Sequence, residues 1–208
     1  MLKFLLSGCF LVFLAVQIDG HGMLLDPVGR GSRWRDDVSA PKNYDDNANY
    51  CGGFWMLQST GKCGLCGDSY SEPSPRKHEL GGRFGQGVIV KTYVNQQKMD
   101  VAARITANHL GHFSFEICNL DKFGKESEEC FAEHKLKFTD GAQKYPIGSR
   151  TGMINVSTLI PNGLKCDHCV LRWTYKAGNN WGVCEDGSGA LGCGMQETFV
   201  NCADIKIQ

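Results

Sequence analysis

The chain has 208 residues and a mass of 22.9 kDa, a size typical of one domain. Hydrophobic residues make up 42% and charged residues 21%, so a globular core is expected and wholesale disorder is excluded. The 22 basic residues equal the 22 acidic residues, which argues against nucleic acid as a partner. The 11 cysteines and 26 glycines, set against 6 prolines, favour short strands joined by turns.

The first twenty residues are typical of a secretory signal peptide. Lys3 precedes an apolar run over 4–16, and the small residue Gly20 ends the segment. A membrane anchor is the alternative, but this run is shorter than the roughly 20 residues that span a bilayer. We therefore expect residues 1–20 to be removed and residues 21–208 to form one secreted, monomeric domain that is free of the membrane.

Secretion also sets the expected state of the cysteines. Cys9 leaves with the signal peptide, and an even number remains, which indicates disulfides in an oxidising compartment. We expect five disulfides among Cys51, Cys63, Cys66, Cys118, Cys130, Cys166, Cys169, Cys184, Cys193 and Cys202. Asn155 begins an Asn-Val-Ser sequon and is a candidate glycosylation site, consistent with secretion.

Two C-x-x-C pairs, at 63–66 and 166–169, invite comparison with a zinc site. About 100 residues separate the pairs, far more than a zinc ribbon allows, so structural disulfides are favoured. Local closures of Cys118 with Cys130, and of either cysteine of the second pair with Cys184, are plausible. The sequence leaves the connectivity open.

The mature chain divides into a loop-rich part and a strand-rich part. Residues 22–85 hold Gly, Pro, Asn and Asp with little periodicity, so we expect long loops with short helical turns. The alternating patterns that follow predict strands near 87–94, 101–106, 112–118, 136–138, 169–175 and 198–207. This arrangement predicts an all-β, disulfide-rich fold, an antiparallel β-sandwich of the immunoglobulin/fibronectin-like type.

Two of the 6 histidines are candidate metal ligands. Cleavage after residue 20 would make His21 the N-terminal residue, which offers its α-amine and its imidazole as two nitrogen donors. The pKa of an α-amine is about 7.7–8.0, so metal binding near neutral pH displaces a proton at little cost. His109 follows a predicted strand and would complete a planar set of three nitrogens. Tetragonal nitrogen ligation favours copper(II), so we expect one copper ion here.

Four segments then occur in a specific order: a signal peptide directly before His21-Gly22, C-G-L-C-G-D over 63–68, A-N-H-L-G-H-F-S-F over 107–115 and Q-E-T-F-V-N-C-A-D-I over 196–205. Each segment alone is a weak signal, but together they span the whole mature chain. In these segments the chain resembles the lytic polysaccharide monooxygenases, most closely the animal-type members, auxiliary-activity family 15.

The resemblance implies a role for each matching residue. His21 would bind copper through its amine and one ring nitrogen, and His109 would supply the third nitrogen of a histidine brace. Phe199 would occupy the axial position, where many members have a tyrosine; a phenylalanine cannot ligate. Ala107 matches the small residue on the solvent-facing axial side.

Several further residues are candidates for supporting roles at the metal or at the substrate. Gln196 and Glu197 are the candidates for the residue that handles protons and oxygen beside the metal. His112 stands where relatives often have an aromatic residue, and we expect it to pack behind the ligands rather than to bind the metal. Tyr44 and Tyr50 in the loop-rich part are candidates for stacking on sugar rings, whereas Trp55 could equally belong to the core.

The activity that the resemblance implies is oxidative cleavage of β-1,4 glycosidic bonds in an insoluble polysaccharide. It uses an external electron donor and peroxide or dioxygen, and the protein supplies orientation and coordination geometry. Chitin is the expected substrate, with cellulose as the second candidate. The alternatives are a non-catalytic chitin-binding or copper-binding protein, and a structural β-sandwich in which His21 is an accident of cleavage.

Overall fold

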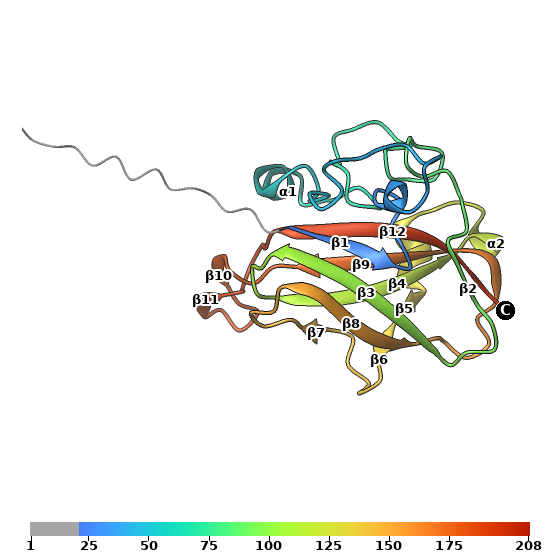
Figure 1. Cartoon of the computed structure of the whole chain (residues 1–208). Helices are drawn as coiled ribbons and strands as arrows, with labels where there is room; N and C mark the ends of the chain where they lie inside the picture. Colours follow the sequence, from blue (N-terminus) through green and yellow to red (C-terminus); the bar gives the residue numbers. More distant parts are fainter. Residues whose placement is uncertain (1–20) are drawn as a thin grey trace, which may run out of the picture.

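The computed structural model describes residues 21–208, and the expected signal peptide lies outside the described residues. Two β-sheets pack face to face, as the sequence predicted (Figure 1). The smaller sheet contains β1 (His21–Asp26), β3 (Lys98–Ala107), β8 (Gly152–Leu159) and β6 (Lys137–Phe138), in that order. The larger sheet contains β2 (Lys91–Tyr93), β12 (Thr198–Ile207), β9 (Cys166–Lys176), β4 (His112–Asn119) and β5 (His134–Lys135), with β7 (Tyr145–Pro146) also paired to β4.

The strands pair antiparallel except at one edge. There β2 runs parallel to the last residues of β12. A separate hairpin of β10 (Trp181–Val183) and β11 (Gly189–Leu191) projects from the end of the molecule at which β1 begins (Figure 1).

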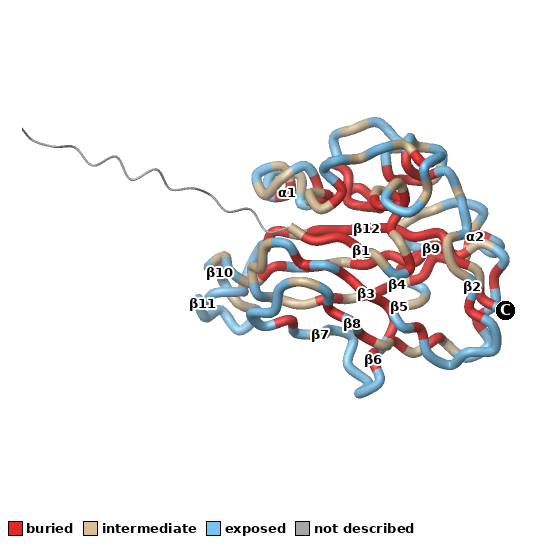
Figure 2. Tube along the Cα trace, viewed as in Figure 1, coloured by how far each residue is buried: buried red, intermediate tan, exposed pale blue. Residues whose placement is uncertain are grey.

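Alternation along the strands builds the core. Phe113, Phe115 and Ile117 on β4 are buried against the smaller sheet, whereas the residues between them face outward. Ile105 and Trp173 meet them from β3 and β9, so one continuous core fills the space between the sheets. Burial alternates along β4, whereas β12 is buried along nearly its whole length and β9 along most of it (Figure 2).

The loop-rich part lies over β12 and contains the short helical turns that the sequence predicted (Figure 1). These are the 3-10 turn Arg33–Arg35 and α1 (Phe54–Thr60); α2 (Leu120–Phe123) and α3 (Glu128–Ala132) follow β4. Over residues 21–208, no helix is long and apolar enough to cross a membrane.

All ten cysteines of residues 21–208 form disulfides: Cys51–Cys63, Cys66–Cys202, Cys118–Cys130, Cys166–Cys169 and Cys184–Cys193. The expected Cys118–Cys130 closure is confirmed. The expected bond from Cys166 or Cys169 to Cys184 is wrong. Those two cysteines stand at the start of β9, and Cys184 follows its far end, about 30 Å away for an 11-residue strand.

A buried ionic network fastens the loop-rich part to the larger sheet. The Arg30 guanidinium donates to both oxygens of Asp204 on β12, at 2.6 and 2.7 Å, and lies 2.6 Å from a Glu126 oxygen. His168 Nε2 bonds the same aspartate at 2.8 Å. Burial alone would raise the pKa of Asp204, but the hydrogen bonds from Arg30 and His168 hold it below its ordinary value.

Candidate metal centre

The pairing of β1 with β3 brings the first described residue to the end of β3. His21 lies opposite Ala107, and His109 follows two residues later in the turn to β4. The hydroxyl of Thr106 donates to the His21 carbonyl at 3.3 Å. Glycine fits closely next in the chain, because a Cβ at Gly22 would lie 2.8 Å from the end of the Ile105 side chain and 3.1 Å from the Trp173 ring.

His109 is held from both its backbone and its ring. Its amide donates to the Tyr175 hydroxyl at 2.8 Å, and its carbonyl accepts from the Gly178 amide at 2.8 Å. Its Nδ1 lies 3.0 Å from a carboxylate oxygen of the buried Glu197. Because a carboxylate only accepts, Nδ1 carries the hydrogen and Nε2 has a free lone pair.

Phe199 lies beneath the two histidines as part of an aromatic cluster. Its ring centroid lies 6.3 Å from that of His21, 6.1 Å from that of Tyr50 and 5.5 Å from that of Tyr175, on which it stacks. Burial, with a smaller effect from Glu197, raises the pKa of Tyr175 to about 12. Its hydroxyl therefore stays protonated and neutral beneath the site.

Among the other predicted site residues, Glu197 contacts the ring of His109, and Ala107 pairs with His21. Gln196 is buried, and its amide bonds the backbone of Asn180 and Cys193 at 2.6–3.0 Å. His112 lies on the outer face of the larger sheet, opposite Lys176 in register. Burial, with Lys144 and Lys176, lowers the pKa of His112.

The aromatic candidates of the loop-rich part differ in how far their side chains are exposed. Tyr50 is half-buried and packs on the core, whereas Tyr44 is 73% exposed with its edge against Trp34. Trp55 on α1 is 75% exposed, so it does not belong to the core. The sequence analysis did not single out Trp181 on the hairpin, which is 68% exposed. Its strand has only three residues, too few for a hydrophobic pattern that predicts exposure.

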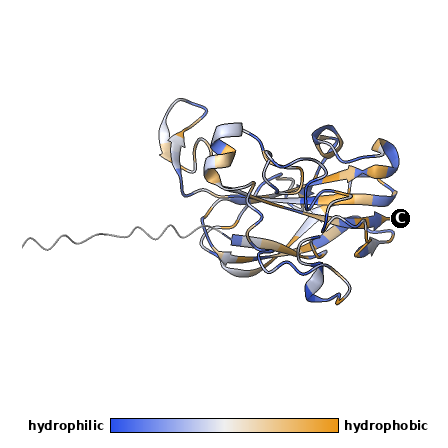
Figure 3. Ribbon diagram, turned by 90° about the horizontal axis from the view of Figure 1, so that it is seen from above, coloured by the Kyte–Doolittle hydropathy of each residue, from blue (hydrophilic) through white to orange (hydrophobic). Residues whose placement is uncertain are grey.

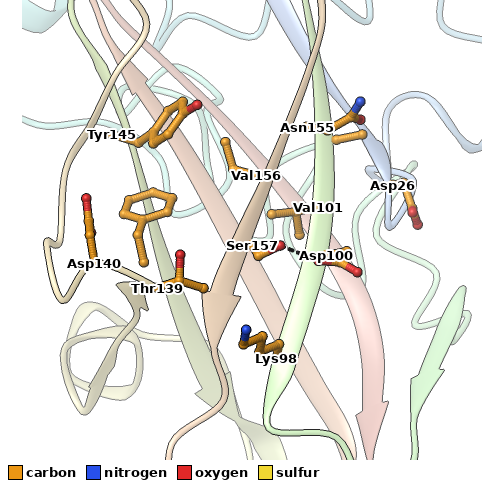
Figure 4. Close-up of a pocket in the computed structure, with 12 residues that line it drawn as sticks. Asp26, Lys98, Asp100, Val101, Thr139, Asp140, Tyr145, Asn155, Val156 and Ser157 are labelled. Atoms are coloured by element: carbon orange, nitrogen blue, oxygen red, sulfur yellow. Dashed lines mark hydrogen bonds between the residues drawn. The ribbon is translucent and has the colours of Figure 1, made fainter.

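The sequon asparagine lies on a different surface. Asn155 is exposed on the outer face of the smaller sheet, where it lines a hollow of about 640 Å³ (Figure 4). The Ser157 hydroxyl of the same sequon donates to Asp100 in this hollow. The side chain is thus accessible, and its glycosylation stays a prediction.

The donor set fits copper rather than zinc or calcium. Within residues 21–208 no three His, Cys, Asp or Glu side chains are placed to hold a metal together. The imidazoles of His21 and His109 lie at the same end of the smaller sheet. The His109 ring is hydrogen-bonded through Nδ1 to the Glu197 carboxylate, as metal-bound histidines commonly are. An α-amine at His21 would add the third nitrogen of a copper-selective set.

Comparisons with known proteins agree with this geometry. A family model described as "Lytic polysaccharide mono-oxygenase, cellulose-degrading" matches residues 21–205. A solved lytic polysaccharide monooxygenase of family AA15 from Thermobia domestica, in the Cu(I) state, is 40% identical. The two superpose with a TM-score of 0.85, over 90% of this chain and 98% of the other. No curated protein matches the sequence.

A chitin binding domain from Burkholderia pseudomallei shares the fold at 11% identity and a TM-score of 0.50, covering 91% of this chain and 100% of the other. The fold and the histidine pair define a copper-dependent polysaccharide monooxygenase. The chain belongs to the lytic polysaccharide monooxygenases, and within them to auxiliary-activity family 15. Membership favours an enzyme over the two non-catalytic alternatives.

Proposed function

We propose that the mature protein begins at His21 and holds a single copper ion between the amine and ring of His21 and the Nε2 atom of His109. The observation that carries this proposal is the hydrogen bond from His109 Nδ1 to Glu197, which leaves Nε2 available beside β1. The start of the family match at residue 21 supports cleavage after residue 20 and secretion.

When bound, copper supplies the one-electron chemistry that activates peroxide or dioxygen with an external electron donor. The protein's own groups orient and protect that chemistry. Glu197 fixes the His109 ring and is the candidate to accept and return a proton at its carboxylate. Phe199 offers no ligand atom and would place an apolar ring beside the metal, 6.3 Å from the ring of His21. Ala107, opposite His21 in the strand register, would leave room beside the metal because its side chain is small.

The proposed substrate is an insoluble β-1,4 polysaccharide, with chitin ahead of cellulose because the chain resembles animal-type members. A crystalline polymer presents a flat surface, so its cleavage requires the metal at the protein surface. The position of His21 at the first residue of β1, with exposed Trp55 on α1 and exposed Tyr44 in the loop-rich part, supports such a contact.

The test uses secreted protein that starts at His21 and is loaded with copper. It is incubated with chitin and, separately, with cellulose, with and without ascorbate, and soluble products are identified by mass spectrometry. His109→Ala and Glu197→Ala are compared with the wild type. Aldonic acid or keto-sugar oligomers that need copper and ascorbate, and disappear in His109→Ala, are expected.

Two results would contradict the proposal. Unoxidised oligomers would identify a hydrolase. An absence of products on both polymers, with tight copper binding retained, would mean that the polymer is wrong or that the protein only binds copper.

A further inference from the structure

One edge of the smaller sheet is open along β8. Because β6 pairs only with Thr158 and Leu159, residues 152–157 have no strand partner on the side away from β3 within the described part of the chain. In Figure 4, Tyr145 lies beyond this edge, across the hollow that Asn155 also lines. At about 3.3 Å per residue, the open edge is roughly 20 Å long. An edge of this length is a template for pairing with another chain.

The other edges of the two sheets are covered, or are short and interrupted. At the opposite edge of the smaller sheet, the Gly22 amide donates to the Asn47 carbonyl at 3.0 Å. The Leu24 amide donates to the Asn201 side chain at 2.9 Å, so β1 is covered. The strands β2, β5, β6 and β7 have two or three residues, and each contains a lysine or a proline: Lys91, Lys135, Lys137 and Pro146. The β10–β11 hairpin stands away from both sheets (Figure 3).

The strand β8 has none of these protective features. No charged residue occurs between Arg150 and Lys165 in the sequence. The pairing of β8 with β3 is one to one along its whole length, so no bulge bends the edge away. Ile154 and Val156 are β-branched, and Met153 between β-strand neighbours is 50% exposed. An uncharged stretch of this composition without proline is typical of segments that associate through their strands.

The glycosylation sequon lies at the centre of this open edge. Asn155 is exposed, and an N-linked glycan is bulky and hydrophilic. If β8 paired antiparallel with β8 of a second copy, residues directly opposite would have Cβ atoms about 4.5–5.5 Å apart. Every register that pairs five or more of residues 152–157 includes Asn155. A glycan there would therefore occupy the space of the second strand's side chains.

We propose that an N-linked glycan on Asn155 covers the open edge of β8 and keeps the protein monomeric, and that without the glycan this edge pairs with β8 of a second copy. This inference rests on the secretion stated under the proposed function. A lipid-linked oligosaccharide diphosphate is the donor: the amide nitrogen of Asn155 loses a proton and bonds the first sugar's anomeric carbon, and the lipid diphosphate leaves. Pairing of one edge with its copy is closed, so it would stop at a dimer.

The test uses secreted, copper-loaded protein that starts at His21, with changes made in the sequon. Mass spectrometry locates the glycan, and sedimentation velocity gives the mass in solution. Asn155→Gln and Ser157→Ala remove the sequon, whereas Ser157→Thr is the matched control that keeps it. Wild type and Ser157→Thr should carry the glycan and stay monomeric. Both sequon variants should associate as concentration rises, with a mass increase of about twofold.

A second pair of changes, made in the Asn155→Gln background, locates the association. Met153→Lys adds a charge to the open edge and should restore the monomer. Val94→Lys adds the same charge outside β8, at a residue that is 49% exposed, and should leave the dimer unchanged. A restored monomer would also show that loss of the sequon does not unfold the chain.

Three results would overturn this inference. They are secreted wild-type protein with no glycan on Asn155, sequon variants that stay monomeric at every concentration, and association that persists after Met153→Lys. Protein that remains inside the cell would instead overturn the proposed secretion, so the two failures are distinct.

Discussion

At the scale of single residues, the centre depends on how His109 is held. A metal-binding imidazole is oriented by what its other nitrogen contacts, and here that contact is Glu197 at 3.0 Å. The Tyr175 hydroxyl holds the backbone of the same histidine from below. Ring and backbone are therefore fixed by separate groups, which separate variants can test.

Replacement of Glu197 should act on the orientation of the His109 imidazole. Glu197→Ala removes the acceptor of the Nδ1 hydrogen, so copper affinity should fall about 10- to 100-fold. Glu197→Gln keeps an oxygen acceptor and should stay near the wild-type affinity. Competition titration against a copper chelator measures both, and equal losses in the two variants would assign the effect to charge rather than to orientation.

Replacement of Tyr175 should act on stability. Tyr175→Phe keeps the stacking on Phe199 but leaves the half-buried His109 amide without its acceptor, which costs about 1 kcal/mol. Tyr145→Phe is the control, because the Tyr145 hydroxyl accepts only from the exposed Arg150. Urea denaturation compares the two, and equal stabilities would show that the hydroxyl of Tyr175 contributes nothing.

At the scale of elements, the strands were predictable where alternation is long. The strand over 198–207 matches β12, and β3, β4 and β9 lie where the pattern placed them. The prediction over 87–94 was too long, because only Lys91–Tyr93 pairs, in parallel, with β12. We did not predict β8, although Ile154 and Val156 alternate with Asn155 and Ser157, a signal that could have located it.

The site was predictable only where residue chemistry or a family motif marks a position. His21 and His109 follow from the chemistry of a chain terminus and a family motif. The exposure of Trp181 does not, because exposure is not encoded in so short a strand pattern. Gln196 is a candidate for the residue that handles protons and oxygen beside the metal, and that role stays a prediction; the structure shows its amide hydrogen-bonded to the hairpin backbone.

The hairpin should loosen when that amide is removed. Gln196→Ala eliminates three hydrogen bonds to Asn180 and Cys193, so amide exchange over 180–193 should accelerate. Exchange in β4 and β9 should remain unchanged, since the core does not depend on this contact. Uniform acceleration throughout the chain would instead indicate global destabilisation.

At the scale of the whole molecule, a disulfide and an ionic network help to join the loop-rich part to the sandwich. Cys66–Cys202 and the Arg30–Asp204 pair both end on β12, the strand that also carries Phe199. The loop-rich part therefore depends on buried contacts with this strand.

The free energy of unfolding should therefore fall at acidic pH as Asp204 becomes protonated. Its folded-state pKa is lowered below the ordinary 3.8, so its contribution is complete above that pH and is lost as the pH falls through the folded value. Asp204→Asn should cost about 3–5 kcal/mol at pH 7 and flatten the dependence below pH ~4. Thermal melts across this range test it, with the exposed Asp36→Asn as control. Identical acid profiles for wild type and Asp204→Asn would contradict the assignment.

The central claim is that a terminal His21 and His109 together form one copper site. The most direct measurement is the electron paramagnetic resonance spectrum of copper(II) bound to protein starting at His21, compared with protein carrying one additional residue before it. The account predicts coupling to three nitrogens and tight one-to-one binding for the first protein, and loss of both for the extended one. Equal spectra and affinities would contradict the account, because they would show that the amine of His21 is not a ligand.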